Sequence, residues 1–362
     1  MKQRVLTTSL GVTALAVALT AISWAPVPVA AQVTKAAATP AAKSAQAATP
    51  VAPKPAAPAK RAWTVPRTPE GVPDLQGYWT NNSYTPLERP KEVATREFYT
   101  LEELRVVEKE RAEKEEEQTV PGTVADVHYD FTQFGLDRSQ TRLADNLRTS
   151  VITNPENGKL PAVTPEGQKR AADRVAARRA QGAQYDQVQN IPIGSRCVYM
   201  NAGPPMMPPG YNPAYQIVQS QGYVTILIEM LHETRVIPTD GRPHAPADVR
   251  SWLGDSTGHW EGDTLVVETT NFNDKVAFRG ASEHMKVTER FTRTSDDAIR
   301  YEFTVDDPHT WERAWKGEMP FVKIGGPIFE HACNEGNYGI RNTLAGARRE
   351  EQEAAAKKTS AK

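Results

Sequence analysis

The sequence lacks the features that mark several common protein classes. Its formal net charge is −1, and no block of basic residues falls on a predicted face, so a nucleic-acid partner is not expected. It contains no P-loop, no G-x-G-x-x-G turn and no G-x-S-x-G nucleophile elbow. The nearest approach to the H-E-x-x-H zinc motif begins at His232 and ends in Val236 instead of a second histidine. We therefore predict no cofactor and no metal.

The N-terminal region has the pattern of an export signal followed by a linker. Lys2 and Arg4 precede an apolar run over residues 5–23, and small residues end at position 31. This pattern predicts a secretory signal peptide over residues 1–31, because no stop-transfer flank follows it. Residues 32–62 are mostly Ala, Pro, Lys, Thr and Gln, which predicts a disordered spacer. We expect a periplasmic or secreted protein with no stable membrane insertion after cleavage.

The rest of the chain is long enough for one large domain. We predict a single mainly-β domain over residues 63–348, with a mixed half at 63–190 and a strand-rich half at 191–345. The tail 349–362 is expected to be a frayed helix or disordered. The sequence does not decide whether the first half is a separate domain, nor the oligomeric state.

The only two cysteines are Cys197 and Cys333. A pair in an oxidising compartment predicts a disulfide, here closing a loop of about 136 residues. In the chain-entropy picture such a bridge stabilises by on the order of 4–5 kcal/mol. The alternative is two free or metal-binding thiols, although cysteines so far apart do not match a zinc pattern.

Capping signals place two helices in the mixed half. "TLEELRVVEKERAEKEEEQ" predicts a surface helix whose start carries a capping box of Thr100 and Glu103. "TPEGQKRAADRVAARRAQ" predicts a second helix, with Thr164 as N-cap and Pro165 at the first helical position.

Alternating strands with short turns fill the second half. In "GHWEGDTLVVETTNF" a two-residue turn at Gly262-Asp263 places Trp260 opposite Leu265. A three-residue loop at 295–297 pairs Phe291 with Tyr301 and Glu289 with Phe303. With "PIFEHAC" as the last strand, eight or nine strands predict an antiparallel barrel or sandwich with helical insertions.

Period-two counting selects three candidate catalytic residues. In "YVTILIEMLHETRVI" a regular strand points His232 into the apolar face, and Glu289 lies among aromatic side chains. Glu229 is a third candidate, on the opposite face unless a bulge intervenes. Burial raises the pKa of a carboxyl, and a neighbouring imidazole could then exchange protons with a substrate. The alternative is that His232 and Glu289 are core polar residues paired with arginine, tyrosine or backbone, and Arg235, Arg290 and Arg300 are available as ion-pair partners.

Aromatic residues near the predicted mouth of the barrel are candidates for ligand contact. The Pro-rich loop "GPPMMPPGYNP" and the predicted disulfide lie in this region of the sequence. The alternative for these aromatic residues is structural packing. The candidates are Tyr301, Phe303, Trp311, Trp315 and Tyr338.

The chain resembles a large family of secreted soil-bacterial proteins with no established activity. The motifs that carry the resemblance run in order from "PDLQGYW" through "RVIPTDGRPH" and "GHWEGDTLVVETTNFND" to "ACNEGNYG". Relatives often have histidine after the cysteine of the last motif, where this chain has Asn334, so a catalytic role of that histidine would put the activity of this member in doubt. A weaker resemblance to lipocalin-like barrels rests on Gly77-x-Trp79 and the run of hairpins.

Three functions are compatible with these patterns. The first is an exported envelope protein that binds a small, partly apolar molecule in a barrel cavity. The second is a lyase, isomerase or hydrolase that uses a buried His/Glu pair for acid–base chemistry. The third is a structural or partner-binding envelope protein.

Overall fold

The computed structural model describes residues 63–360 except 94, 116–142, 145, 201–202, 209–211, 274 and 276–277. The predicted signal peptide and spacer lie outside the described residues. The helices are α1 Leu101–Glu115, α2 Pro165–Ala180 and α3 Gly339–Ser360. The strands are β1 Gly77–Thr80, β2 Ile152–Asn154, β3 Ala214–Ser220, β4 Tyr223–Ile228, β5 Thr234–Pro238, β6 Asp255–Glu261, β7 Thr264–Thr270, β8 Lys286–Arg293, β9 Ala298–Asp306 and β10 Trp315–Lys323.

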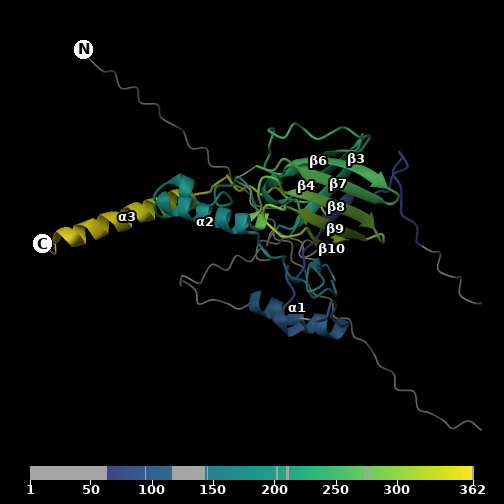
Figure 1. The fold of residues 1–362 in the computed structure, drawn as a ribbon, viewed down its shortest axis with the longest axis horizontal. Helices are drawn as coiled ribbons and strands as arrows, with labels where there is room; N and C mark the ends of the chain where they lie inside the picture. The colour runs from purple at the N-terminus through teal and green to yellow at the C-terminus, as the bar shows by residue number, and fades with distance from the viewer. Residues whose placement is uncertain are drawn as a thin grey trace, which may run out of the picture. The chain divides into compact units, whose positions relative to one another are not determined.

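The strands form one antiparallel sheet that curls into a nearly closed barrel. Their order is β5-β4-β3-β1-β10-β9-β8-β7-β6, and β2 pairs with β10 off this path. Figure 1 shows β6 to β10 side by side. The two end strands meet through side chains: a Cβ added to Gly258 on β6 would lie 2.9 Å from Cγ2 of Ile237 on β5. The predicted mainly-β antiparallel barrel is confirmed.

Both predicted hairpin registers are confirmed. Trp260 lies opposite Leu265 across the turn at Gly262, whose positive φ suits the first central position of a tight hairpin turn. Phe291 pairs with Tyr301 across the longer loop between β8 and β9, as the sequence predicts. Turn length fixes which residues face each other, so these local signals also fix which side chains point inward.

Other predicted elements differ. Residues 327–333 form no strand, because the amide of Phe329 donates to the Glu229 carboxylate at 3.1 Å instead of joining a strand ladder. The predicted strand pair around residues 154–158 gives one strand, β2, and a single bridge between Val163 and Trp311. The tail is helical as far as Ser360, since α3 continues without a break from Gly339.

Helix α1 begins with the predicted capping box. The amide of Thr100 donates to Glu103 Oε2 at 2.9 Å, and the Glu103 amide donates to Thr100 Oγ1 at 3.2 Å.

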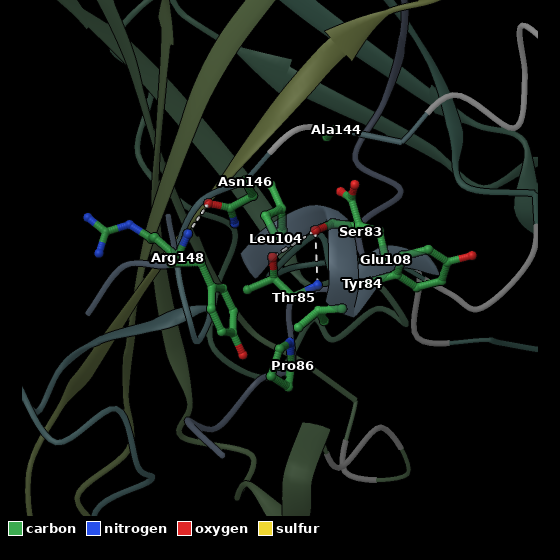
Figure 2. Close-up of a pocket in the computed structure, with 11 residues that line it drawn as sticks. Ser83, Tyr84, Thr85, Pro86, Leu104, Glu108, Ala144, Asn146 and Arg148 are labelled. Atoms are coloured by element: carbon green, nitrogen blue, oxygen red, sulfur yellow. Dashed lines mark hydrogen bonds between the residues drawn. The ribbon is translucent and has the colours of Figure 1, made fainter. Parts of the chain in front are cut away.

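A surface pocket lies where α1 meets the loop 83–86, with Leu104 on its wall (Figure 2). The buried Asn146 Nδ2 beside this pocket has no hydrogen-bond partner among the described residues.

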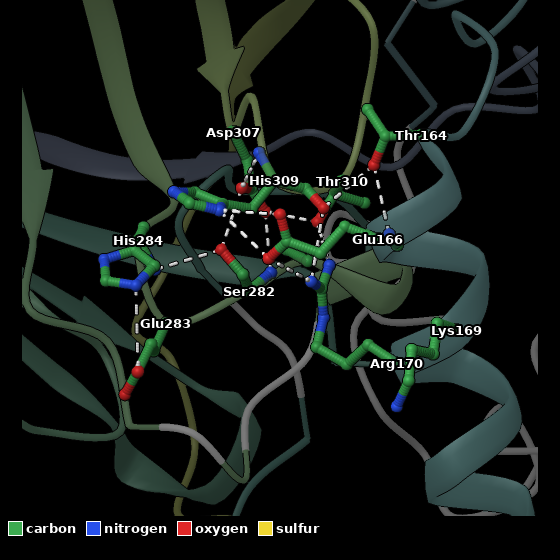
Figure 3. A network of polar contacts seen from close by, with 12 residues as sticks. Thr164, Glu166, Lys169, Arg170, Ser282, Glu283, His284, Asp307, His309 and Thr310 are labelled. Carbon is green, nitrogen blue, oxygen red and sulfur yellow. Dashed lines mark hydrogen bonds and ion pairs between the residues drawn. The ribbon is translucent and has the colours of Figure 1, made fainter.

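Helix α2 is anchored to the barrel by a polar network (Figure 3). Asp307, almost fully buried after β9, accepts hydrogen bonds from the Ser282 amide at 2.6 Å and from Thr310 Oγ1 at 2.5 Å. Arg170 of α2 donates to the same Thr310 hydroxyl and to His309 O. The predicted N-cap is confirmed, since Thr164 Oγ1 accepts from the Gly167 amide at 3.0 Å.

Side chains fill the barrel. A side chain with no accessible surface touches no void that could admit a water molecule. Residues from eight strands meet this condition, so the centre of the barrel is packed and not hollow at these positions. They are Trp79, Tyr215, Ile228, Ile237, Val267, Val287, Glu289, Ile299, Tyr301, Trp315 and Phe321, all 0% exposed.

One ion pair is enclosed within this packing. Glu289 of β8 is 0% exposed, and Arg235 of β5 binds both of its carboxylate oxygens, at 3.0 and 2.5 Å. The Tyr301 hydroxyl donates to Oε1 of the same carboxylate at 2.8 Å. Burial and the nearby Glu289 charge raise the pKa of Tyr301 well above its usual range, so this hydroxyl keeps its proton.

Breaking this pair is expected to be costly. Glu289→Gln leaves the Arg235 charge unpaired in the barrel, and we expect a loss of about 3–5 kcal/mol in the free energy of unfolding. The matched control is Glu261→Gln, which breaks an exposed pair with Arg290 on the outer face and should change stability by less than about 1 kcal/mol. Urea unfolding measures both variants, and equal losses would contradict the assignment of the pair as a core element.

Candidate functional site

A short segment closes one end of the barrel over the ion pair. In residues 203–208, the Met206 amide donates to the Tyr301 hydroxyl at 2.8 Å, and Met206 O accepts from Asn81 Nδ2 at 2.7 Å. The Met206 side chain is 0% exposed. A Cβ added to Gly203 would lie in ordinary contact with Arg235 Cδ, at 3.7 Å. We call this end of the barrel the mouth and residues 203–208 the plug.

Polar atoms beneath the plug lack partners. Asn81 Oδ1 and Arg235 Nε are buried and have no hydrogen-bond partner within the part of the chain that the structure describes. Burial raises the pKa of Tyr215, and a hydrogen bond from the Asn81 side chain and the Arg235 charge oppose the rise, so the three groups lie close together. Buried polar atoms are normally paired, so this concentration needs a cause.

A strained turn forms the rim beside the plug. After β4 the chain passes through Glu229 into the 3-10 turn Met230–His232, where Leu231 has φ 56° and His232 has φ 53°. Such left-handed conformations cost L-residues roughly 1–2 kcal/mol each. Strain of this kind is common at functional sites, where the surrounding structure holds it in place.

This turn overturns the predicted direction of His232. The prediction assumed one regular strand through residues 223–237, whereas the turn resets the alternation. The residues buried after it are Arg235 and Ile237, and the His232 side chain is exposed to solvent. The structure therefore does not bring His232 to Glu289, which lies inside the barrel.

Carboxyl and imidazole groups gather at the rim. Glu229, 3% exposed, accepts from Asn212 Nδ2 at 2.8 Å and from the Phe329 amide at 3.1 Å. Burial raises the pKa of Glu229, and these two hydrogen bonds oppose the rise. His331 Nδ1 accepts from the Leu231 amide at 3.3 Å. Burial and the neighbouring His232 lower the pKa of His331, which favours its neutral form with the proton on Nε2.

Glu233 completes the rim cluster, which consists of Glu229, His232, Glu233 and His331. Burial raises the pKa of Glu233 to about 7, and its Oε2 has no hydrogen-bond partner among the described residues. A carboxyl with this pKa can give or take a proton near neutral pH. The predicted disulfide is confirmed between Cys197 and Cys333, and it anchors the chain two residues after His331.

The aromatic ligand candidates do not line one cavity. Tyr301, Phe303, Trp311 and Trp315 are at most 2% exposed and pack against one another in the core, with the Phe303 and Trp315 rings 5.6 Å apart. Tyr338 is 65% exposed, just before α3. Large rings fill the inward strand positions and leave no open space between them. The prediction that these aromatic residues together contact a ligand is therefore wrong.

The residues that the prediction missed are Asn81, Met206, Tyr215 and Glu233. Glu233 would follow from the sequence only if the break after Ile228 could be recognised, and no glycine, proline or asparagine marks it. Arg235 is one of the arginines predicted as ion-pair partners, and its pair with Glu289 confirms that alternative for Glu289. Among the described residues, no three histidine, cysteine, aspartate or glutamate side chains are grouped as metal ligands would be.

Comparison with protein-family models and with curated proteins finds no match for the chain. Among solved structures, the crystal structure of a mutant of the fluorescent protein UnaG is similar at 12% identity and a TM-score of 0.20, covering 37% of this chain and 87% of that one. The fold assignment thus rests on the strand pairing of this chain, and the lipocalin-like likeness stays a prediction. No helix in the described ranges has the length and apolar character needed to cross a membrane.

Relief of the rim strain gives a first test. His232→Gly should raise the free energy of unfolding by about 1 kcal/mol, because glycine adopts positive φ without steric cost. His259, exposed on β6 in an extended conformation, is the control. His259→Gly should lower the free energy of unfolding by about 0.5–1 kcal/mol, because glycine weakens a strand. Chemical denaturation compares the two, and destabilisation by both would show that the turn is not strained.

The pH dependence of stability tests the burial of Glu233. Its pKa is raised when folded, so its contribution to stability is complete below the unfolded pKa and is lost as the pH rises through about 7. As the pH rises from about 5 to about 8, the free energy of unfolding of Glu233→Gln should therefore increase relative to that of the native chain. After a discount for the partial exposure of Glu233, we expect a difference on the order of 1–2 kcal/mol. Thermal unfolding of both across this range measures the difference, and parallel pH profiles would contradict the assignment.

Proposed function

We propose that this chain is an exported envelope protein that binds a small, partly apolar molecule at the mouth of its barrel. The observation that carries the proposal is the set of buried polar atoms beneath the plug: Asn81 Oδ1 and Arg235 Nε have no partner among the described residues, and the Tyr215 hydroxyl lies beside Asn81. A ligand with hydrogen-bonding groups would satisfy them. The disulfide fits an oxidising compartment outside the cytoplasm.

The mouth is a better location than the barrel centre. The centre is occupied by aromatic side chains with no accessible surface, and a ligand would have to displace them. At the mouth, the plug covers these buried polar groups through the contacts of Met206 with Asn81 and of Gly203 with Arg235. A purely structural barrel would also be packed, but each unpaired buried polar group would cost it about 1–3 kcal/mol with no gain.

The rim cluster favours a second candidate function, an enzyme that moves protons on the bound molecule. Glu233 titrates near neutral pH, and His331 is held by the Leu231 amide with its proton on Nε2. Glu229 and the exposed His232 lie in the same turn. This set suits general acid–base steps of a lyase, isomerase or hydrolase.

Native mass spectrometry of the mature protein, purified from the periplasm without added ligand, tests the binding function. We expect a discrete bound mass on the native chain and about tenfold lower occupancy on Tyr215→Phe, because a hydrogen bond to the ligand is lost. This variant should lose no more than about 1 kcal/mol in the free energy of unfolding, since the hydroxyl makes only the hydrogen bond with the Asn81 side chain among the described residues. Tyr223→Phe, on the outer face where its hydroxyl accepts from Arg242, is the control and should retain the ligand.

A bare mass for the native chain, together with equal behaviour of the two tyrosine variants, would contradict binding at the mouth. If a ligand is identified, its turnover separates the two candidates. Loss of turnover in Glu233→Gln, with binding retained and with Glu261→Gln unaffected, would establish the enzyme.

A further inference from the structure

The contacts that hold the plug resemble those between a receptor and a bound peptide. The barrel binds both polar groups of one residue, Met206: Tyr301 accepts from its N–H at 2.8 Å and Asn81 donates to its C=O at 2.7 Å. The side chain of Met206 is enclosed at the same time. Paired contacts to the N–H, the C=O and the side chain of a single residue are the elements of peptide recognition.

We propose that the mouth is a binding site for a short peptide with an unbranched apolar side chain, and that the plug occupies it as an internal pseudo-ligand. The inference rests on the proposed binding function and specifies its ligand class. An external peptide would take the place of Met206, with its own N–H on Tyr301 and its own C=O on Asn81. The site suits a neutral peptide, because Glu289 already neutralises the Arg235 charge.

The plug pairs only some of the hydrogen-bonding groups at the mouth, because prolines remove several of its N–H donors. Its residues read Gly-Pro-Pro-Met-Met-Pro, so the peptide units that end at Pro204, Pro205 and Pro208 carry no N–H. These units cannot donate to Asn81 Oδ1, for which the described residues supply no partner. The Tyr215 hydroxyl and Arg235 Nε likewise receive no acceptor from the plug. A peptide without prolines beside its central residue could pair more of these atoms.

The apolar part of the site favours a flexible chain. Met206 packs in the same cluster as Ile228, Tyr215 and Met319. The Asn81 amide also lies 3.5 Å from the Met319 sulfur. Methionine fills irregular spaces because its side chain is unbranched and polarisable, whereas a β-branched residue is restricted at χ1. We therefore expect methionine or another unbranched side chain at the centre of the bound peptide.

Covalent attachment protects the plug from replacement. A tethered segment competes at an effective concentration in the millimolar range. Weak binding of free peptide to the native chain, and tighter binding once the plug loses its anchor, follow from this competition.

Calorimetric titration with the peptide acetyl-Ala-Met-Ala-amide tests the proposal on the full mature chain. We expect Met206→Gly to bind this probe with a Kd about tenfold lower than the native chain, because the competing side chain is gone. Met207→Gly is the control, since Met207 is only half-buried on the same segment, and its Kd should stay within about twofold of the native value. Acetyl-Pro-Met-Pro-amide should bind Met206→Gly about fivefold more weakly than the alanine probe, because it lacks two N–H donors.

Hydrogen exchange on the native chain keeps the proposal testable if Met206→Gly does not fold. The Met206 amide should exchange about 100-fold faster than the amide of Phe303 in the β8–β9 ladder, because the plug opens locally. Millimolar acetyl-Ala-Met-Ala-amide should accelerate Met206 exchange further and leave Phe303 unchanged. Exchange of Met206 at the rate of Phe303, with or without the probe, would overturn the proposal.

The outcomes separate this inference from the proposed function. A copurified molecule that is not a peptide, with no probe binding to folded Met206→Gly, rejects the peptide inference and leaves binding at the mouth in place. Probe binding that is equal in the native chain, Met206→Gly and Met207→Gly shows a site elsewhere and also rejects it. Absence of both a bound mass and probe binding rejects the two together.

Discussion

Pairing of the Arg235 and Glu289 charges inside the barrel is the constraint on which the rest of the structure depends. An isolated charge in such a dry interior would be strongly unfavourable, so each ion requires the other at close range. The two residues come from β5 and β8, which are not neighbours in the sheet, and their contact joins parts of the wall that lie three strands apart across the meeting of β5 and β6. Tyr301 extends the network to the mouth, because its hydroxyl donates to Glu289 and accepts from Met206. The electrostatics of the core and the occupation of the mouth are thus parts of one hydrogen-bonded chain.

The rim combines two kinds of constraint. The turn at Leu231 is strained, and its amide is the group that binds His331. The disulfide fixes the chain two residues after that histidine. Of the six described non-glycine residues with positive φ, four belong to this region or are bonded to it: Cys197, Asn212, Leu231 and His232. A covalent tie and a set of buried hydrogen bonds together hold these left-handed conformations, which are uncommon for residues other than glycine and asparagine.

Local signals in the sequence predicted much of the barrel. The two hairpin registers followed from turn length, and the burial of Glu289 among aromatic residues followed from the register. The direction of His232 could not be predicted, because the turn Met230–His232 contains no glycine or proline to mark it in the sequence. Its conformation is imposed by tertiary contacts instead. The sequence offers Arg235, Arg290 and Arg300 as partners for a buried carboxylate, and the reset of the alternation selects Arg235 by placing it inside the barrel.

The mouth was beyond prediction for a related reason. A Pro-rich loop indicates irregular backbone, but its burial depends on side chains from distant strands. In the sequence, Asn81 lies 125 positions from Met206 and Tyr301 lies 95 positions from it. No local pattern carries information at that range, whereas the folded sheet places all three together.

The meeting of β5 and β6 has a mechanical consequence. No ladder of backbone hydrogen bonds joins these strands within the described residues, and their contact consists of side chains such as Ile237 against the backbone at Gly258 and Arg235 against Ser256. Every other neighbouring pair around the wall is bonded through its backbone. The barrel therefore has one seam along which its circumference can change without breaking a strand ladder. Arg235 lies at this seam. Its guanidinium pairs with Glu289 inside the barrel and also contacts Ser256 on β6, so one side chain links the core to the contact between the two end strands.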